Sequence, residues 1–297
     1  MVPFAASTSS SAGHDREDDV EQPHPGTAGS SGPNWDRIRS AGLRQTVPAM
    51  RITSLNLQGF TDWEARMPRV VAYLRSMSPD VILFQEVVWL PEIAPVTQLD
   101  LLSRELDYPF RHQSVTRLQR GRVVADYREG LGLLSRHPVP STEALVLHHE
   151  EGDPHQRIVQ LADIDVDGTT WPLMNVHLSV RDDFALHHLE EVLRLQESRH
   201  ERRILGGDFN VDHLERHGRL WRGWARLTSE QVDYLSRPLS HETDDYFLVP
   251  DRYEIATVQI SGDGLSDHRA LTVDLTPVPA AAAGSEPASG RRSEPAA

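Results

Sequence analysis

The chain has 297 residues, no cysteine and a formal net charge of −14 at pH 7, and all 30 of its Lys and Arg residues are Arg. This length is ample for one large buried core, and the missing cysteines exclude disulfides and thiolate metal sites. The acidic balance disfavours a broad face for long nucleic acid, although local arginine clusters still bind phosphate.

The two ends of the chain differ in composition from its middle. Residues 1–46 are rich in Ser, Gly, Pro and acidic residues, and residues 278–297 have the same character. Such segments bury too little apolar area to order themselves, so we expect a disordered leader and a disordered tail. Apolar runs continue across residues 47–277, which predicts a single domain there. We find no pattern of a signal peptide or a membrane span, so the expected location is the cytoplasm.

The first predicted elements form a strand, helix, strand unit. Residues 50–57 and 81–84 are apolar stretches of strand length, which predicts two buried strands. The stretch between them has apolar residues at helical spacing, and Pro68 fits the first turn of a helix. These apolar positions are Met67, Val70, Val71 and Leu74.

Further helices and strands follow. Helical spacing predicts a second helix that ends before Tyr108-Pro109 and a third that precedes an Ile204-Leu205 strand. Their apolar faces are Val96, Leu99, Leu102 and Leu106, and Leu186, Leu189, Val192, Leu193 and Gln196. Other strands are expected at residues 130–134, 158–166, 171–176, 246–249, 255–260 and 270–275, with Asp167-Gly168 as a hairpin turn. This mixture predicts an α/β fold of layered sheets flanked by helices.

Polar side chains end four apolar runs that are far apart in the sequence. The segments are Phe84-Gln85-Glu86, Asn175-Val176-His177, Gly207-Asp208-Phe209-Asn210 and Ser266-Asp267-His268. Attack of water on a phosphoester builds up negative charge, so the site needs a hard cation, a group that activates water, and neutral or positive donors. Carboxylates bind Mg²⁺ or Mn²⁺ through oxygen, whereas neutral amides donate to phosphate without competing for the metal. The residue types therefore predict a phosphoester-cleaving metal site.

Taken in order, the motifs of residues 50–277 resemble those of the endonuclease/exonuclease/phosphatase superfamily, which includes deoxyribonucleases and sphingomyelinases. The matching segments are Ser54-Leu55-Asn56-Leu57, Pro79-Asp80-Val81-Ile82-Leu83-Phe84-Gln85-Glu86, Gly132-Leu133-Leu134-Ser135-Arg136-His137-Pro138, Asn175-Val176-His177-Leu178, Gly206-Gly207-Asp208-Phe209-Asn210, Asp245-Tyr246-Phe247-Leu248 and Ser266-Asp267-His268. The resemblance implies a four-layer α/β sandwich, with two packed mixed β-sheets flanked by helices. It also implies that residues 47–277 are a catalytic domain.

The resemblance assigns a metal set. Glu86 resembles the principal ligand of Mg²⁺ or Mn²⁺, and Asn56 resembles the amide beside it. Asp208 and Asp267 resemble carboxylates that hold the metal or its water.

The resemblance also assigns a catalytic set. His268 resembles the imidazole that contacts phosphate or takes a proton from water, with Asp245 fixing its tautomer. Asp208 shares the role of base with His268, and Asn210 resembles a donor to a phosphate oxygen. His177 resembles a second histidine that binds phosphate or protonates the leaving oxygen.

Two departures narrow the expected activity. Gln58 stands where abasic-site endonucleases carry an acidic residue, and Asn175 and His177 stand where they carry Tyr and Asn. Abasic-site repair is therefore disfavoured. We predict a metal-dependent hydrolase of a small or lipid-linked phosphoester, as a diesterase or a monoesterase. The alternatives are a nuclease for DNA or RNA and a non-catalytic interaction module on the same fold. The substrate, the number of metal ions and the oligomeric state stay open.

Several polar features have structural interpretations. Arg157 enters a predicted strand and faces either the site or the surface. A solvated loop accounts for His148, His149 and His155 beside acidic residues, and Trp221 is expected to cover the core.

Overall fold

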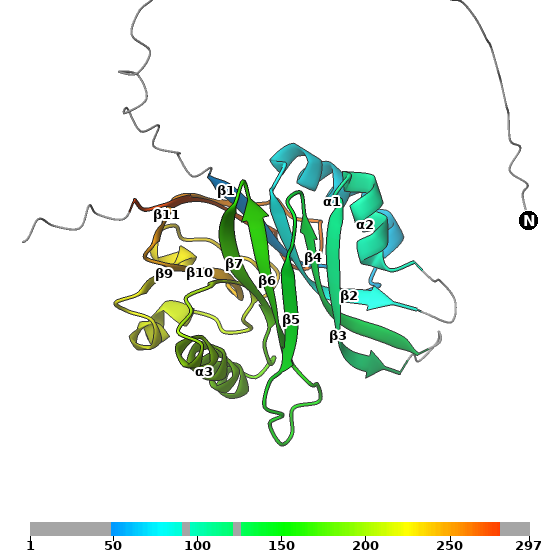
Figure 1. The fold of residues 1–297 in the computed structure, drawn as a ribbon. Coiled ribbons are helices and arrows are strands. Elements are labelled where there is room, and N and C mark those ends of the chain that lie inside the picture. The colour runs from blue at the N-terminus through cyan, green and yellow to red at the C-terminus, as the bar shows by residue number, and fades with distance from the viewer. Residues whose placement is uncertain (1–48, 91–95, 121–125, 280–297) are drawn as a thin grey trace, which may run out of the picture. The chain divides into compact units, whose positions relative to one another are not determined.

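The computed structural model describes residues 49–90, 96–120 and 126–279 (Figure 1). The predicted leader, residues 1–46, and all of the predicted tail after Pro279 lie outside the described residues. No helix in these ranges has the length and apolar character that a membrane crossing requires.

Six strands form one sheet, called sheet A. In spatial order they are β11 (Tyr253–Ile260), β12 (Leu271–Pro277), β1 (Met50–Asn56), β2 (Val81–Trp89), β4 (Tyr127–Ser135) and β3 (Phe110–Gln119). Only the β1–β2 pair is parallel among these strands. The predicted strand, helix, strand unit explains that pair, because a parallel connection needs a crossover segment.

Six other strands form a second sheet, called sheet B. In spatial order they are β5 (Ser141–Val146), β6 (Ile158–Val166), β7 (Thr169–His177), β8 (Ile204–Asp208), β10 (Asp245–Pro250) and β9 (Ala225–Leu227). The β7–β8 pair is parallel and the others are antiparallel. The predicted Asp167-Gly168 turn joins β6 to β7, and both of its residues have positive φ, as a two-residue hairpin loop requires.

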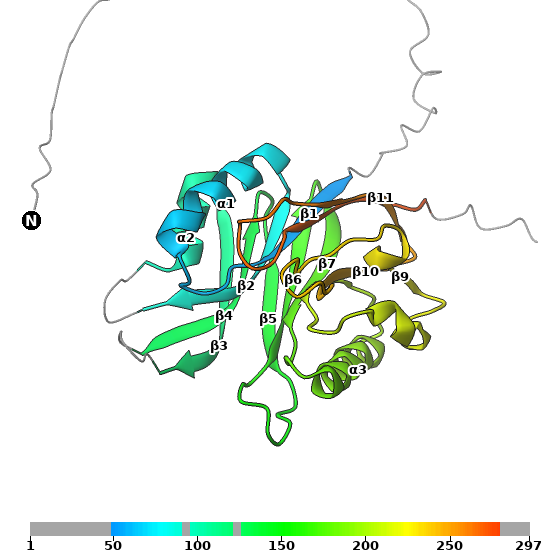
Figure 2. The same cartoon turned by 180° about the vertical axis from the view of Figure 1, so that it is seen from behind.

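Helices cover the outer face of each sheet (Figures 1 and 2). Helices α1 (Trp63–Met77) and α2 (Gln98–Leu106) pack on sheet A, and α3 (Asp182–Ser198) packs on sheet B. Short 3-10 helices span Leu214–Leu220 and Thr228–Glu230. The fold is thus a four-layer α/β sandwich of two mixed sheets between helices, which confirms the predicted fold class.

Central strands are buried on both faces. On β2, Ile82 and Phe84 belong to the cluster under α1 and α2, whereas Val81 and Leu83 belong to the cluster between the sheets. Successive strand residues point to opposite faces, so a strand covered on both sides is apolar throughout. This is why residues 81–84 could be predicted as a buried strand.

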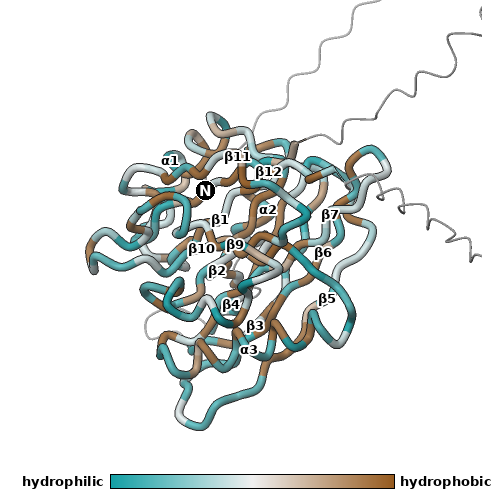
Figure 3. The backbone as a smooth tube through the Cα atoms, turned by 90° about the vertical axis from the view of Figure 1, so that its left-hand side faces the viewer, coloured by the Kyte–Doolittle hydropathy of each residue, from teal (hydrophilic) through white to brown (hydrophobic). Residues whose placement is uncertain are grey.

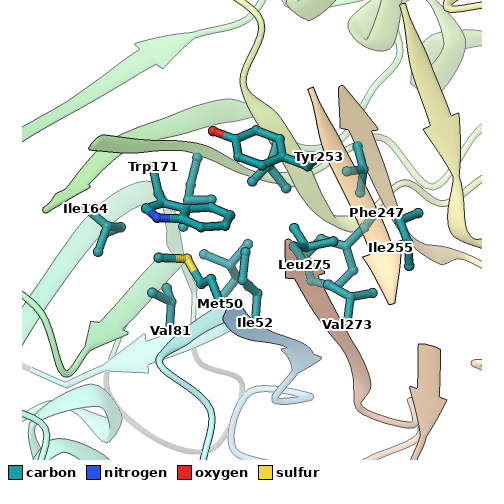
Figure 4. Packing of buried hydrophobic residues seen from close by; sticks show 14 of the residues in the cluster. Met50, Ile52, Val81, Ile164, Trp171, Phe247, Tyr253, Ile255, Val273 and Leu275 are labelled. Carbon is teal, nitrogen blue, oxygen red and sulfur yellow. The ribbon is translucent and has the colours of Figure 1, made fainter. Parts of the chain in front are cut away.

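The layer between the sheets is a close-packed apolar core (Figure 4). Trp171 from sheet B is fully buried and stacks on Tyr253 from sheet A, with ring centroids 4.8 Å apart. Figure 3 shows hydrophobic stretches along the strands, whereas the peripheral loops are largely hydrophilic. Burial of a large aromatic pair in this layer holds the two sheets together.

A buried amide network replaces apolar packing near one end of this layer. The Asn175 amide nitrogen on sheet B donates to the carbonyl oxygens of Phe84 and Gly132 on sheet A, each at 3.1 Å. The Asn175 side-chain oxygen accepts a 2.8 Å hydrogen bond from Gln85. Buried polar groups cost free energy unless they are paired, so this network fixes one sheet on the other.

Candidate active site

Three polar residues are aligned across neighbouring strands of sheet B. His177 on β7 pairs with Asp208 on β8, and Asp208 pairs with Asp245 on β10. Directly paired residues point to the same face of a sheet. Phe247, two residues after Asp245, lies in the core between the sheets, so all three side chains face sheet A.

Two glycines allow this alignment. Gly207 has φ +139°, and a Cβ atom there would lie 2.1 Å from the carbonyl oxygen of Val176. A Cβ atom on Gly206 would lie 2.4 Å from the ring of Phe247. Glycine therefore lets β8 fit between β7 and β10 directly before Asp208.

Asn56 connects the sheets at this position. Its amide nitrogen donates to Asp208 Oδ2 at 2.9 Å and lies 3.3 Å from Glu86 Oε1. Asn56 is 1 % exposed, and its side-chain oxygen accepts a hydrogen bond from the backbone of Gln58. A neutral donor thus stands between two carboxylates that would otherwise repel each other.

Glu86 reaches the site because β2 is irregular there. The pairing of β2 with β4 shifts between Phe84 and Val87, and Glu86 has φ +52°. Gln85 already faces sheet B through its bond to Asn175, so regular alternation would turn Glu86 away. The bulge instead brings the Glu86 carboxylate beside Asn56. Bulges and strained backbone conformations are common at functional sites, where they redirect a side chain.

Asp245 and His268 form a hydrogen-bonded pair. His268 Nδ1 lies 2.7 Å from Asp245 Oδ2, and His268 Nε2 lies 3.8 Å from Asp208 Oδ2. Burial lowers the pKa of His268, but the charges of Asp245 and Asp208 outweigh it and raise that pKa to about 10. The imidazolium is thus favoured, and its Nε2 proton faces Asp208.

His177 has the opposite electrostatic setting. Its Nε2 lies 3.6 Å from Asp208 Oδ2, on the side away from Asp245 in the strand order. Burial, followed by the charges of Arg157 and Arg117, lowers the pKa of His177 well below its usual value. Burial also raises the pKa of Asp208 to about 7 against the charge of His268. One neutral and one charged imidazole therefore flank a carboxyl group that titrates near neutrality.

The remaining predicted residues are at the edge of this group. Asn210 has φ +52°; its backbone nitrogen donates to Asp208 Oδ1 at 3.0 Å, and its amide nitrogen donates to the Leu178 carbonyl. The backbone nitrogen of Asp267 donates to Gln58 Oε1 at 3.2 Å. The departure at Gln58 therefore has a structural role, because its amide holds the loop that carries Asp267.

Comparison with known proteins shows which family this chain belongs to. A family model described as Endonuclease/Exonuclease/phosphatase family matches residues 53–268. The chain belongs to this family. Its members generally hydrolyse phosphoesters. No curated protein sequence matches the chain.

Solved structures of the endonuclease/exonuclease/phosphatase family share the fold. The protein from Beutenbergia cavernae DSM 12333 is 19 % identical with a TM-score of 0.66, over 77 % of this chain and 72 % of that one. Humanized D. rerio TDP2 is 17 % identical with a TM-score of 0.59, over 77 % and 99 %. The human Nocturnin catalytic domain with bound sulfate anion is 16 % identical with a TM-score of 0.58, over 77 % and 95 %.

The donor set of this family member fits a hard cation. Ligand atoms of Asp208, Asp245 and His268 lie within 4.8 Å of one another. Because His268 Nδ1 is bonded to Asp245, that imidazole nitrogen is not a free ligand. In the described part of the chain, Asp245 Oδ1 and Asp267 Oδ1 are buried acceptors without a hydrogen-bond donor. Such orphaned carboxylate oxygens suit a divalent cation.

The close cluster and the predicted metal set overlap only in part. The structure brings three members of the predicted metal set together, because Asn56 lies within hydrogen-bond distance of both Glu86 and Asp208. Asp267 is linked to this pair through Gln58 and has no contact with Glu86 among the interactions described. The cluster of closest ligand atoms contains Asp245, which the sequence assigned to orienting His268.

Of the two arginines beside His177, the sequence left the role of Arg157 open and gave no indication of Arg117. Arg157 is 2 % exposed, and its Nη1 lies 3.5 Å from the carbonyl oxygen of His177, so it faces the site and not the surface. Arg117 on β3 forms a 2.5 Å ion pair with Glu129 on β4. The position of Arg157 directly before a strand was a usable signal, but neither strand alternation nor motif pointed to Arg117.

Other features have packing roles. Trp221 is 1 % exposed and lies in the core under α3, as expected. Burial followed by the charge of Arg117 lowers the pKa of His155 to about 4. His148 donates its backbone nitrogen to Glu191. Among the described residues, the His148, His149 and His155 loop is not part of a group of possible metal ligands.

Proposed function

We propose that residues 47–277 are the catalytic domain of a hydrolase that uses Mg²⁺ or Mn²⁺ to cleave a small or lipid-linked phosphoester by attack of water. The carrying observation is the convergence of Asn56, Asp208 and His268 from three distant segments, with Asp208 Oδ2 shared between them. Retention of several buried ionisable groups around one point is costly for stability, so a catalytic purpose is the best explanation.

Glu86, Asp208, Asp267 and the side-chain oxygen of Asn56 are the proposed metal holders. When bound, the cation would neutralise charge on the phosphoryl oxygens and polarise the phosphorus centre. Asn56 separates Glu86 from Asp208, which lowers their mutual repulsion before the cation binds. The orphaned Asp267 Oδ1 supplies a further acceptor.

Asp208 is the proposed base. Its pKa, raised to about 7 by burial, matches the requirement that a base titrates near the working pH. His268 stays protonated through Asp245, so we assign it the donation of a hydrogen bond to a phosphoryl oxygen. We assign to neutral His177 the donation of a hydrogen bond to the leaving-group oxygen. One amide proton of Asn210 is donated to the Leu178 carbonyl, and the other is assigned to a phosphate oxygen.

A nuclease is the second candidate. A D. rerio TDP2 structure with a TM-score of 0.59 is described as complexed with single strand DNA product, and the present chain shares that fold. The net charge of −14 opposes tight binding of a long polyanion. We therefore place small and lipid-linked phosphoesters before nucleic acid, and the non-catalytic module last.

The test is hydrolysis of bis-p-nitrophenyl phosphate by the purified chain in Mg²⁺ or Mn²⁺ and in EDTA. We expect activity only with the cation, and a loss of at least two orders of magnitude in kcat for Asp208→Asn and for His268→Asn. Asp251→Asn is the matched control, because Asp251 is half-exposed just after the opposite end of β10. Equal rates in the site variants and the control would refute the assignment.

A side-by-side substrate panel then separates the candidates. It contains plasmid DNA, RNA, sphingomyelin, inositol phosphates and nucleotides, each assayed at physiological salt. Efficient nicking of plasmid with little turnover of the small esters would establish the nuclease instead.

A further inference from the structure

A narrow crevice lies beside His177, where the ends of the two sheets meet. Its lining includes Thr116, Arg117, Glu129, Arg157 and His177. The roles proposed above use only His177 from this set. The crevice therefore holds two guanidinium groups next to the candidate active site. The proposed reaction assigns no role to either of them.

A bulge in β3 directs Arg117 into the crevice. Val115 pairs with Gly130 and Arg117 pairs with Glu129, so Thr116 is an extra residue in β3. Ser114 faces sheet B, where its hydroxyl accepts a hydrogen bond from Gln160. In a regular strand Arg117 would face away from that side, because alternate residues point to opposite faces. The extra residue reverses the facing of Arg117, as bulges near functional sites do.

Arg117 forms an ion pair with Glu129, which also lines the crevice. Its Nη2 lies 2.5 Å from Glu129 Oε1, and the two side chains are 14 % and 8 % exposed. Burial raises the pKa of Glu129, and the charge of Arg117 opposes that rise. The carboxylate keeps the guanidinium in place and compensates its charge while no substrate is bound.

Arg157 brings an unused donor to the crevice. The residue is 2 % exposed, and its Nε has no acceptor among the described residues. A buried guanidinium normally satisfies its donors, so an orphaned Nε indicates a missing anionic or polar partner. Burial, followed by the charges of Arg117 and Arg157, lowers the pKa of His155 to about 4 against the charge of Asp153, so both guanidinium groups act on that side chain.

We infer that Arg117 and Arg157 form a subsite for a second phosphoryl group of the substrate, on the His177 side of the bond that is cleaved. This inference rests on the proposed function and narrows it to phosphoesters that carry another phosphate in their leaving part. The second phosphate takes hydrogen bonds from Arg157 and draws Arg117 away from Glu129. Guanidinium groups suit this task because they bind phosphate through paired, charge-assisted hydrogen bonds.

A matched pair of substrates tests the subsite. One is the methyl ester of thymidine 5′-phosphate, and the other is the same ester with an additional 3′-phosphate. Cleavage of the bond between phosphorus and O5′ releases thymidine or thymidine 3′-phosphate as the leaving alcohol, and chromatography measures each product. The measured quantity is the ratio of their kcat/KM values. We expect a preference of about tenfold or more for the doubly phosphorylated ester, the factor that one charge-assisted hydrogen bond supplies.

Three variants decide whether Arg117 causes the preference. Arg117→Met keeps the unbranched stem of the side chain but removes the guanidinium, and it is expected to bring the ratio close to one. Arg111→Met is the control, since Arg111 lies on the same strand, is 51 % exposed and pairs with Asp100 outside the crevice. Glu129→Gln releases Arg117 from its carboxylate and is expected to raise the ratio. A ratio that is unchanged in Arg117→Met would overturn the subsite, provided that its unfolding temperature matches that of Arg111→Met.

A binding measurement separates this inference from the proposed function. Inorganic pyrophosphate is titrated into the protein in EDTA by calorimetry, so the result needs neither cation nor turnover. We expect binding that weakens about tenfold in Arg117→Met and stays unchanged in Arg111→Met. Binding of this kind without hydrolysis of any ester would sustain the subsite and reject the proposed function. Hydrolysis of both esters at equal rates, with no pyrophosphate binding in EDTA, would do the reverse.

Discussion

Asn56 at the end of β1 donates its amide to Asp208 at the end of β8, so one 2.9 Å hydrogen bond joins the two sheets within the candidate site. The amide also lies 3.3 Å from Glu86. A neutral residue between two carboxylates lowers their repulsion, so the folded site is stable without a cation. Replacing Asn56 with a charged residue should therefore make the stability of the fold depend on the cation.

We expect Asn56→Asp to make folding depend strongly on the cation. A third carboxylate beside Asp208 and Glu86 adds repulsion and removes a donor, which should cost about 3 kcal/mol in EDTA. Added Mg²⁺ or Mn²⁺ should restore stability, because a ligand that binds only the folded state raises the free energy of unfolding. Urea unfolding with and without the cation measures both effects. If the cation has the same effect on Asn56→Asp as on the parent chain, these residues do not hold it.

The pair of His268 and Asp245 predicts a pH dependence of stability. The pKa of His268 is raised to about 10 from 6.5, so its stabilising contribution is complete below pH 6.5 and is lost as the pH rises toward 10. We expect the free energy of unfolding in EDTA to fall across this window, and to fall less in Asp245→Asn. Asp251→Asn should follow the parent curve, because it leaves the pair intact.

The backbone of Glu86 predicts a difference between two inactive variants. Glu86→Ala and Glu86→Gly both remove the carboxylate, so each should lose at least two orders of magnitude in kcat. At φ +52° an alanine is strained by about 1 kcal/mol and a glycine is not. Chemical denaturation should therefore show Glu86→Gly to be the more stable of the two. The opposite order would mean that the bulge relaxes once the carboxylate is gone.

Asn175→Ala should destabilise the sandwich although it leaves every proposed catalytic group in place. It leaves the Phe84 carbonyl and the Gln85 amide without their bonds across the layers, and each unsatisfied group costs about 1–3 kcal/mol. Thermal unfolding should reveal the loss, while Gln259→Ala at an exposed position of β11 should have no effect. An unchanged unfolding temperature would show that the network is dispensable.

Much of the fold could be predicted because the central strands are apolar on both faces. The helices were recognised by the spacing of apolar residues. The N-cap of α2 is Thr97, and its capping box with Asp100 is a further signal that the prediction did not use. The prediction missed β3, β5 and β9. β3 has few apolar residues and is mostly half-buried at the edge of sheet A, and β5 is mostly exposed at the edge of sheet B, so neither has a strong hydrophobic pattern.

The sequence named most of the polar residues that the structure brings together, but it could not predict their electrostatics. Apolar runs that end in Asp208 and His177 are visible in the sequence, whereas the opposite charge states of His177 and His268 depend on neighbours from other strands. The position of Arg117 in the site could not be predicted for a different reason. The face of the sheet to which its side chain points depends on the bulge at Thr116, and the alternation of residues along the sequence does not reveal a bulge.

The irregularities in β2 and β3 also affect how relatives of this chain should be compared. If β3 ran regularly through Thr116, Thr116 would lie opposite Glu129, and its side chain would take the place of the Arg117 guanidinium on the side that faces sheet B. Two homologues can then match letter for letter around this point and still differ in what their substrates meet. Residues that determine specificity should therefore be matched between homologues by superposing their structures and not by aligning their sequences alone.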